Sequence, residues 1–207
     1  LNFMEKSPQK SENIILPKDI ATLLENLVLP AEMLKGKILD IGAGAADFAR
    51  AFENSKDMSI TSLDEQFDKN IKIQASVKNL PIADNSYDMV ISHASIPHVF
   101  LQMYSHEFPE QSELEMESAV KKSLLEIVRV LKNGKSAYLS PIVIAEKYES
   151  QKAIKTAILN AVEYLKKLGI NVVFELIRTV TNPENGEKCD NYRLILKKPI
   201  AQIKTDD

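Results

Sequence analysis

The sequence predicts an α/β fold, with a doubly wound sheet of about seven strands that is mostly parallel and ends in an antiparallel hairpin. Short apolar segments alternate with helical patterns through the middle of the chain, as they do in parallel βαβ units. The first of these segments stops at two glycines, and a new helical pattern follows at once. The last two β-rich segments are joined by a connection that is too short to hold a helix.

The chain begins with a segment that we expect to be flexible. Residues 1–17 lack a basic start and a long apolar centre, so we expect no secretory signal there. From Asp19 to Leu27 apolar side chains recur at helical spacing, and Pro30 suits the first turn of a second short helix. We expect residues 18–35 to form a helical lid or side wall before the first strand.

Five short apolar segments are predicted to be the parallel strands. They cover about residues 37–41, 59–63, 71–75, 89–92 and 136–143. Ser112 and Glu115 stand at capping-box spacing, which predicts that a helix begins there. A later helix is predicted over about residues 150–168, with Gly169 as its stop. No linker-like segment divides the chain, so we expect one domain over residues 1–207.

The end of the chain differs in pattern from the middle. Residues 172–180 and 192–196 are β-rich, and Asn182-Pro-Glu-Asn-Gly186 between them has the composition of a hairpin turn. This predicts an antiparallel strand pair at one edge of the sheet. A nicotinamide-binding domain more usually ends in parallel strands.

The glycine turn after the first strand indicates a nucleoside cofactor. Gly42 and Gly44 follow Asp40, but Asp47 stands where a dinucleotide fingerprint requires a third small residue. A carboxylate there would repel a pyrophosphate, which argues against a dehydrogenase. The next apolar segment ends at Asp64, about twenty residues on, where a βαβ unit places the acid that binds ribose hydroxyls. The alternative is that Asp64 caps a following helix.

Two further motifs make the pattern specific. Residues 80–88 contain Leu-Pro followed by Asp-x-Ser-aromatic-Asp, and residues 125–134 contain Arg-Val-Leu-Lys-Asn-Gly. With the glycine turn, these motifs resemble the class I S-adenosylmethionine-dependent methyltransferases in their small single-domain, Rossmann-like form. The chain departs from that family's pattern at a few positions. These are Ala46, Ser76, Asn133 and Lys135.

The resemblance implies S-adenosylmethionine as the cofactor and S-adenosylhomocysteine as its product. It assigns cofactor contacts to the ends of the first four strands. The residues concerned are Asp40, Gly42, Ala43, Gly44, Asp64, Glu65, Ser76, Val77 and Ser92. His93 and His98 follow the fourth strand, where the transferred methyl group would lie, so either is a candidate base. The alternative is that each histidine only hydrogen-bonds to its loop. Residues 104–107 resemble an insertion that covers the substrate.

The composition limits the remaining classes. A single cysteine, Cys189, excludes an internal disulfide and a cysteine-based zinc site, and it fits a reducing, cytoplasmic compartment. A net charge of −3 and no basic run make a nucleic-acid substrate unlikely. No apolar run approaches the roughly eighteen residues that span a bilayer.

Two functions follow from this pattern. The first is methyl transfer to a small molecule or to an exposed protein side chain. The second is a non-catalytic domain that binds S-adenosylmethionine or a partner protein. Four departures from the family's motifs motivate the second. The sequence predicts no metal site, and it leaves the oligomeric state open.

Overall fold

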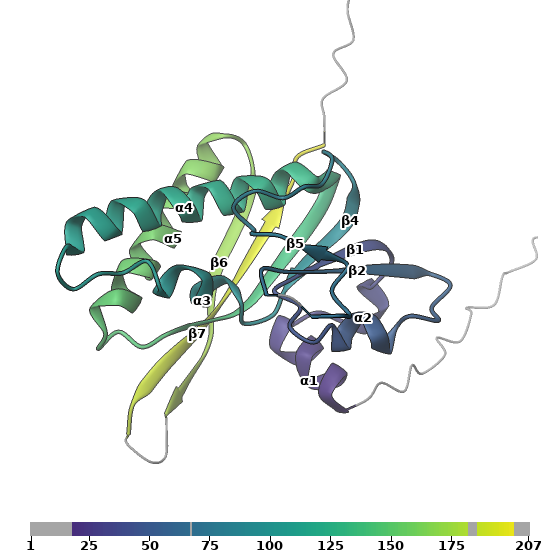
Figure 1. Cartoon of the computed structure of the whole chain (residues 1–207), viewed down its shortest axis with the longest axis horizontal. Coiled ribbons are helices and arrows are strands. Elements are labelled where there is room, and N and C mark those ends of the chain that lie inside the picture. Colours follow the sequence, from purple (N-terminus) through teal and green to yellow (C-terminus); the bar gives the residue numbers. More distant parts are fainter. Residues whose placement is uncertain (1–17, 67, 182–185, 201–207) are drawn as a thin grey trace, which may run out of the picture.

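The computed structural model describes residues 18–66, 68–181 and 186–200, and these form one sheet with helices on both faces (Figure 1). The sheet order is β3-β2-β1-β4-β5-β7-β6. The strands are β1 (Gly36–Ile41), β2 (Met58–Asp64), β3 (Ile73–Gln74), β4 (Tyr87–Ser92), β5 (Leu131–Ile144), β6 (Asn171–Thr181) and β7 (Lys188–Lys197). The helices are α1 (Lys18–Leu27), α2 (Asp47–Ala51), α3 (Ile96–Leu101), α4 (Pro109–Val130) and α5 (Glu149–Lys167), with a short 3₁₀ turn, η1, at Ala31–Met33.

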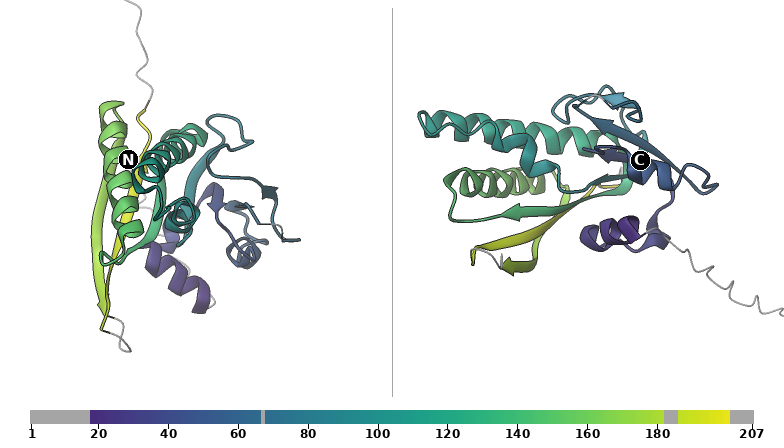
Figure 2. Two further views of the ribbon diagram at one scale, coloured as in Figure 1. Left: turned by 60° about the vertical axis from the view of Figure 1, so that its left-hand side comes forward. Right: turned by 60° about the horizontal axis from the view of Figure 1, so that its bottom comes forward.

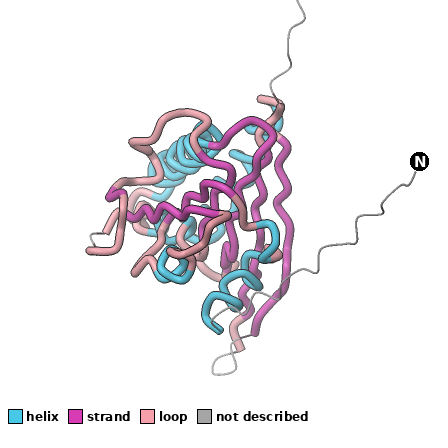
Figure 3. Tube along the Cα trace, turned by 90° about the vertical axis from the view of Figure 1, so that its right-hand side faces the viewer, coloured by secondary structure: helices cyan, strands magenta, loops and turns pink. Residues whose placement is uncertain are grey.

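The strand directions confirm the predicted fold class. β1 to β5 pair in parallel, whereas β7 runs antiparallel to both β5 and β6. The long β6–β7 pair runs down one side of the molecule (Figure 3). The hairpin turn expected at residues 182–186 lies largely outside the described residues, as does the segment 1–17. None of the described helices is long and apolar enough to cross a bilayer.

The two faces of the sheet carry separate cores. α3, α4 and α5 cover one face, and α1, η1 and α2 lie on the other (Figure 2). The alternation along β1 explains the division, because successive side chains of a strand point to opposite faces. Leu39 and Ile41 belong to the core that α3, α4 and α5 cover, whereas Ile38 belongs to the other core, with Leu24 of α1 and Phe48 of α2. The N-terminal helix is therefore held against the sheet as a side wall.

The structure corrects three expectations about single elements. α4 begins at Pro109, one turn before the predicted capping box, and Ser112 donates its hydroxyl to the Pro109 carbonyl instead of capping the helix. Proline fits this first helical position because its φ is already helical and it has no N–H to satisfy. β3 spans two residues where five were expected. Just before β3, the main-chain N–H of Lys72 bonds to the carbonyl and the hydroxyl of Ser62, and regular pairing covers only Ile73 and Gln74. In the described part of 65–86, no helix separates the strands.

The two later motifs of the sequence meet in space through Arg129 at the end of α4. Its guanidinium donates to the carbonyls of Leu80 and Ile82 and forms ion pairs with Glu126 and Asp84. Glu126 in turn accepts the N–H of Leu80 at 2.8 Å. These contacts pin the loop before β4 to the helix before β5. The motifs therefore fix the packing of the loop that follows β3.

Candidate cofactor and active site

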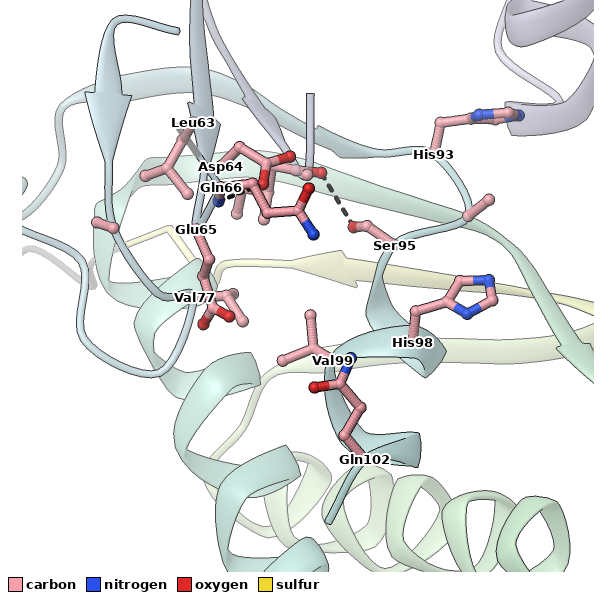
Figure 4. A pocket seen from close by; sticks show the side chains of 14 residues that line it. Leu63, Asp64, Glu65, Gln66, Val77, His93, Ser95, His98, Val99 and Gln102 are labelled. Carbon is pink, nitrogen blue, oxygen red and sulfur yellow. Dashed lines mark hydrogen bonds between the residues drawn. The ribbon is translucent and has the colours of Figure 1, made fainter. Parts of the chain in front are cut away.

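A pocket of about 350 Å³ lies at the carboxyl ends of β1, β2 and β4 (Figure 4). This is the edge where ligands bind in open α/β sheets. The strand ends contribute one wall, and the turn into α3 with α3 itself contributes the other. The lining residues are Ile41, Gly42, Leu63, Asp64, Glu65, Gln66, Ala75, Val77, His93, Ala94, Ser95, His98, Val99 and Gln102.

Asp64 ties the end of β2 to the glycine turn after β1. Its Oδ2 accepts the N–H of Gly44 at 3.0 Å, and its Oδ1 accepts the N–H of Gln66 at 2.9 Å. A carboxylate oxygen has two lone pairs, so each oxygen can still accept from a ligand hydroxyl. Asp64 therefore orders a turn while facing the pocket. It does not cap a helix, since residues 65–66 are not helical.

The glycine turn approaches the α3 side of the pocket closely at Gly42. A Cβ at this position would overlap the Cβ and Oγ of Ser95, and the φ of +71° also favours glycine. The Ser95 hydroxyl bonds to the carbonyl of Ile41 at 3.1 Å and to Oγ of Ser92 at 2.5 Å. Gly44 faces open space instead. Ser95 therefore fastens the β4–α3 turn onto the end of β1 in this structure.

Asp40 is the buried acid of the site, with only 4% of its surface exposed. Burial raises the pKa of the Asp40 carboxyl to about 7, and the negative charge of Asp64 adds to this effect. Near neutral pH, Asp40 is therefore divided between its protonated and ionised forms. A cation placed in the pocket would favour the ionised form.

His93 is held by a residue of α1. Nδ2 of Asn26 lies 3.3 Å from Nε2 of His93, and Oδ1 of Asn26 accepts from Arg178 at 3.2 Å. Because a guanidinium can only donate, the Asn26 amide must turn its oxygen to Arg178 and its NH₂ to the imidazole. Nε2 of His93 therefore accepts, and the ring carries its proton on Nδ1. Burial lowers the pKa of His93 below its ordinary value, which keeps the ring neutral.

The α3 side of the pocket comes from residues at helical spacing. Ser95, His98, Val99 and Gln102 follow the i, i+3, i+4, i+7 pattern, which places them on one face of the turn and helix. Figure 4 shows the side chains of His93 and His98 on the opposite side of the pocket from Asp64 and Val77. Of the four residues at helical spacing, only His98 was predicted from the sequence as a site residue.

The structure brings together some of the predicted site residues and leaves others beside the pocket. Those that line it are Gly42, Asp64, Glu65, Val77, His93 and His98. The others, Asp40, Ala43, Gly44, Ser76 and Ser92, do not line it. Ser92 is buried behind Ser95, and Ser76 uses its hydroxyl to accept the N–H of Lys78 within a turn. Residues 104–107 lie outside the lining, where Tyr104 and His106 stack edge to face. The described residues contain no cluster that could hold a metal ion.

Comparison with known families decides which fold family this site belongs to. Residues 39–139, which include the glycine turn, Asp64 and the β4–α3 turn, match the family model of the methyltransferase domain. Residues 39–139 therefore belong to the methyltransferase domain family. The resemblance seen in the motifs is thereby confirmed. No curated protein sequence matches the chain significantly.

Solved structures with the same fold differ widely in sequence. The [4+2]-cyclase SpnF is 15% identical, with 87% of this chain and 80% of that chain covered and a TM-score of 0.54. Phosphoethanolamine N-methyltransferase 2 of Haemonchus contortus, solved with phosphomonomethylethanolamine and S-adenosylhomocysteine, is 14% identical, with 87% and 52% covered and a TM-score of 0.53. A methyltransferase from Methanosarcina mazei is 16% identical, with 89% and 99% covered and a TM-score of 0.50. At these identities the likeness shows the fold alone.

Proposed function

We propose that this protein is an S-adenosylmethionine-dependent methyltransferase that acts on a small-molecule nucleophile or an exposed protein side chain. The observation that carries the proposal is the carboxylate of Asp64, which faces a pocket at the strand ends while ordering the glycine turn. The match of residues 39–139 to the methyltransferase domain supports it. The lone, half-buried Cys189 fits a protein of the reducing cytoplasm.

The residues of the pocket suit the nucleoside half of this cofactor. Leu63, Ala75 and Val77 on the strand side and Val99 on the α3 side offer apolar surface on which an adenine ring can pack. Asp64 beside them can accept both ribose hydroxyls. Beside the pocket, the open space around Gly44 leaves room for close approach to the glycine turn. Asp40 supplies a buried carboxyl near the same turn, where the cofactor's positive charge would favour the ionised form.

The two histidines take different roles in this proposal. S-adenosylmethionine supplies a methyl group on a sulfonium, so the protein has to align the nucleophile and exclude water. His98 lies on the pocket wall with an exposed ring, and we assign to it the removal of a proton from the acceptor. His93 has its Nε2 lone pair engaged by Asn26, so it offers an N–H on Nδ1 and positions the acceptor.

A second candidate is a domain that binds a ligand on this fold without methyl transfer. The observation that favours it is Ser95, which fills the space that a ligand would need for close approach to Gly42. A neighbour with the same fold is named as a [4+2]-cyclase, so the fold also serves a protein named for another reaction. Transfer of a labelled methyl group to any acceptor separates the two candidates.

Calorimetric titration with S-adenosylmethionine and S-adenosylhomocysteine tests the cofactor. Asp64→Asn keeps an oxygen for one turn N–H but loses the charge, and we expect binding about tenfold weaker or worse, since charge-assisted hydrogen bonds are the strong ones. Asp57→Asn is the matched control, because Asp57 is an exposed aspartate just before β2, at the end of the strand away from the pocket. Wild type and the control should bind equally well.

An acceptor screen then tests catalysis. If the assignment of the base is right, His98→Gln should lower kcat while leaving the affinity for S-adenosylmethionine unchanged. Absence of cofactor binding to the wild-type chain, or preference for NAD, would contradict the proposal. Cofactor binding without transfer to any acceptor would favour the non-catalytic candidate.

A further inference from the structure

β6 is a long edge strand with an apolar, exposed surface. It spans Asn171–Thr181 and pairs with β7 on one side only, so its other side forms an outer edge of the sheet (Figure 2, left view). Four of its apolar side chains stay open to solvent. They are Leu176 at 51%, Val180 at 44%, Val173 at 41% and Ile177 at 37% exposure. The strand contains no proline and no lysine, two of the residues that can protect such an edge.

A bulge in β6 places two opposite charges on the same face. Leu176 pairs with Tyr192 and Arg178 with Asn191, so Ile177 is the extra residue. In a regular strand, residues 175 and 178 would point to opposite faces. Here Arg178 bonds to Asn26 of α1, and Glu175 pairs with Arg193, which itself reaches the carbonyl of Val28 after α1. Glu175 and Arg178 therefore share the α1 face of the sheet.

This arrangement makes the edge complementary to itself. When two copies of β6 pair antiparallel about a twofold axis between Leu176 and Ile177, position 175 faces position 178 of the other copy, and position 173 faces position 180. Residues directly opposed in an antiparallel pair share a face, and the bulge gives both pairs that property. Each copy then places Glu175 opposite Arg178 and Val173 opposite Val180, twice per dimer.

Both charged groups keep atoms for such a contact. Arg193 directs its Nε and Nη2 to the same oxygen of Glu175, Oε1, so Oε2 can accept from another donor. Arg178 donates one N–H to Asn26, and a guanidinium has five. An ion pair between copies would therefore add to the contacts within each chain without replacing them.

We propose that β6 is a docking edge for a second copy of this chain, which extends the sheet across a twofold axis. The contact covers one strand per copy, which is small beside a standard interface, so the dimer should depend on concentration. It also lies next to the Arg178–Asn26–His93 chain of contacts. Arg178, which would pair with the other copy, also bonds to Asn26, and Asn26 bonds to His93 in the wall of the pocket.

Cysteine crosslinking tests the register without changing any charge. Cys189 pairs with Val180 across β6 and β7, so the background is Cys189→Ser. Val173→Cys and Val180→Cys are made separately, then mixed and oxidised. We expect a disulfide-linked dimer in the mixture and little in either variant alone. Position 173 of one copy faces position 180 of the other, and neither position faces its own equivalent. Equal crosslinking of one variant alone, or none in the mixture, would overturn the register.

Charge reversal tests the contact in solution by sedimentation over a wide range of concentration. Arg178→Glu opposes two carboxylates at each pair and should raise the dissociation constant of the dimer about tenfold or more. Adding Glu175→Arg to it restores opposite charges and should recover the dimer. Lys167→Glu, an exposed reversal on α5, is the matched control and should dimerise like the wild type. A wild-type chain that stays monomeric at every concentration would overturn the proposal.

Discussion

Asn26 of α1 donates a side-chain N–H to Nε2 of His93 at the end of β4, across 3.3 Å and 67 positions of sequence. Arg178 of β6 fixes which way the amide faces, so the three residues form one directed chain of hydrogen bonds from Arg178 through Asn26 to His93. The N-terminal helix thus determines the tautomer of an imidazole in the pocket wall. α1 therefore influences the chemistry available to His93.

The first prediction concerns the hydrogen bond from Asn26 to His93. Asn26→Asp replaces the NH₂ with an acceptor, so we expect the pKa of His93 to rise, whereas burial holds it below its ordinary value in the wild type. An NMR titration of the three imidazoles measures this, with Asn54→Asp in an exposed turn as the control. The same His93 titration in both variants would contradict the contact.

The second prediction concerns the buried carboxyl. The pKa of Asp40 is about 7 in the fold and 3.8 in its ordinary state, so between these pH values only the unfolded chain has lost this proton. The free energy of unfolding should therefore fall as the pH rises through that range, by up to roughly 1.4 kcal/mol per unit. Asp40→Asn should abolish this dependence.

Urea unfolding of wild type and Asp40→Asn between those pH values measures the difference. The stability of the variant relative to the wild type should grow as the pH rises and become constant above about 7. S-adenosylmethionine added above that pH should reduce the difference in stability between the two chains, because a cation favours the ionised carboxylate. A constant gap at all pH values would show that Asp40 titrates normally.

The third prediction concerns the contacts of Arg129, which join the two later motifs. Arg129→Met leaves Glu126 and the carbonyls of Leu80 and Ile82 without their donor, so we expect a loss of roughly 3 kcal/mol in the free energy of unfolding. Lys166→Met breaks an exposed pair with Glu163 and should cost less than about 0.5 kcal/mol. Equal denaturant midpoints for the two variants would show that the contacts of Arg129 do not stabilise the fold.

The fourth prediction tests the contact between the glycine turn and the β4–α3 turn. Gly42→Ala should destabilise the fold by roughly 2 kcal/mol, since its Cβ overlaps Ser95 and its φ is positive. Ser95→Gly removes the overlapping atoms, so the double variant should recover part of that loss, the backbone strain remaining. Thermal unfolding of the four chains gives the coupling between the two positions. Strictly additive losses would show that the two residues do not touch.

The sequence was informative about the fold wherever a period or a spacing was long enough. β1, β4 and α5 lie close to the predicted ranges, because their apolar side chains face a core on a fixed repeat. The start of α4 was mispredicted, because Ser112 bonds to a carbonyl of its own helix and thereby loses its capping role. The length of β3 was mispredicted because Lys72, which was expected within the strand, bonds instead to the hydroxyl of Ser62, a partner ten residues away.

The site was predictable on the strand side and only in part on the helix side. Motif spacing leads to Gly42 and Asp64 because a strand end fixes where the next residue lies. Gln66 and Gln102 carry no motif, and only the three-dimensional turn brings them to the pocket. The roles of Asn26 and Arg178 depend on contacts 67 and 152 positions apart, which no local pattern encodes.

The two hydroxyl bonds of Ser95 have a kinetic consequence. A ligand that needs the space above Gly42 can enter only after Ser95 leaves Ile41 and Ser92. Its observed association rate should then level off at high ligand concentration, at the rate with which the turn opens, and should stop rising with diffusional encounter. Release of the Ser95 hydrogen bonds, rather than diffusion of the ligand, would then limit the rate of binding.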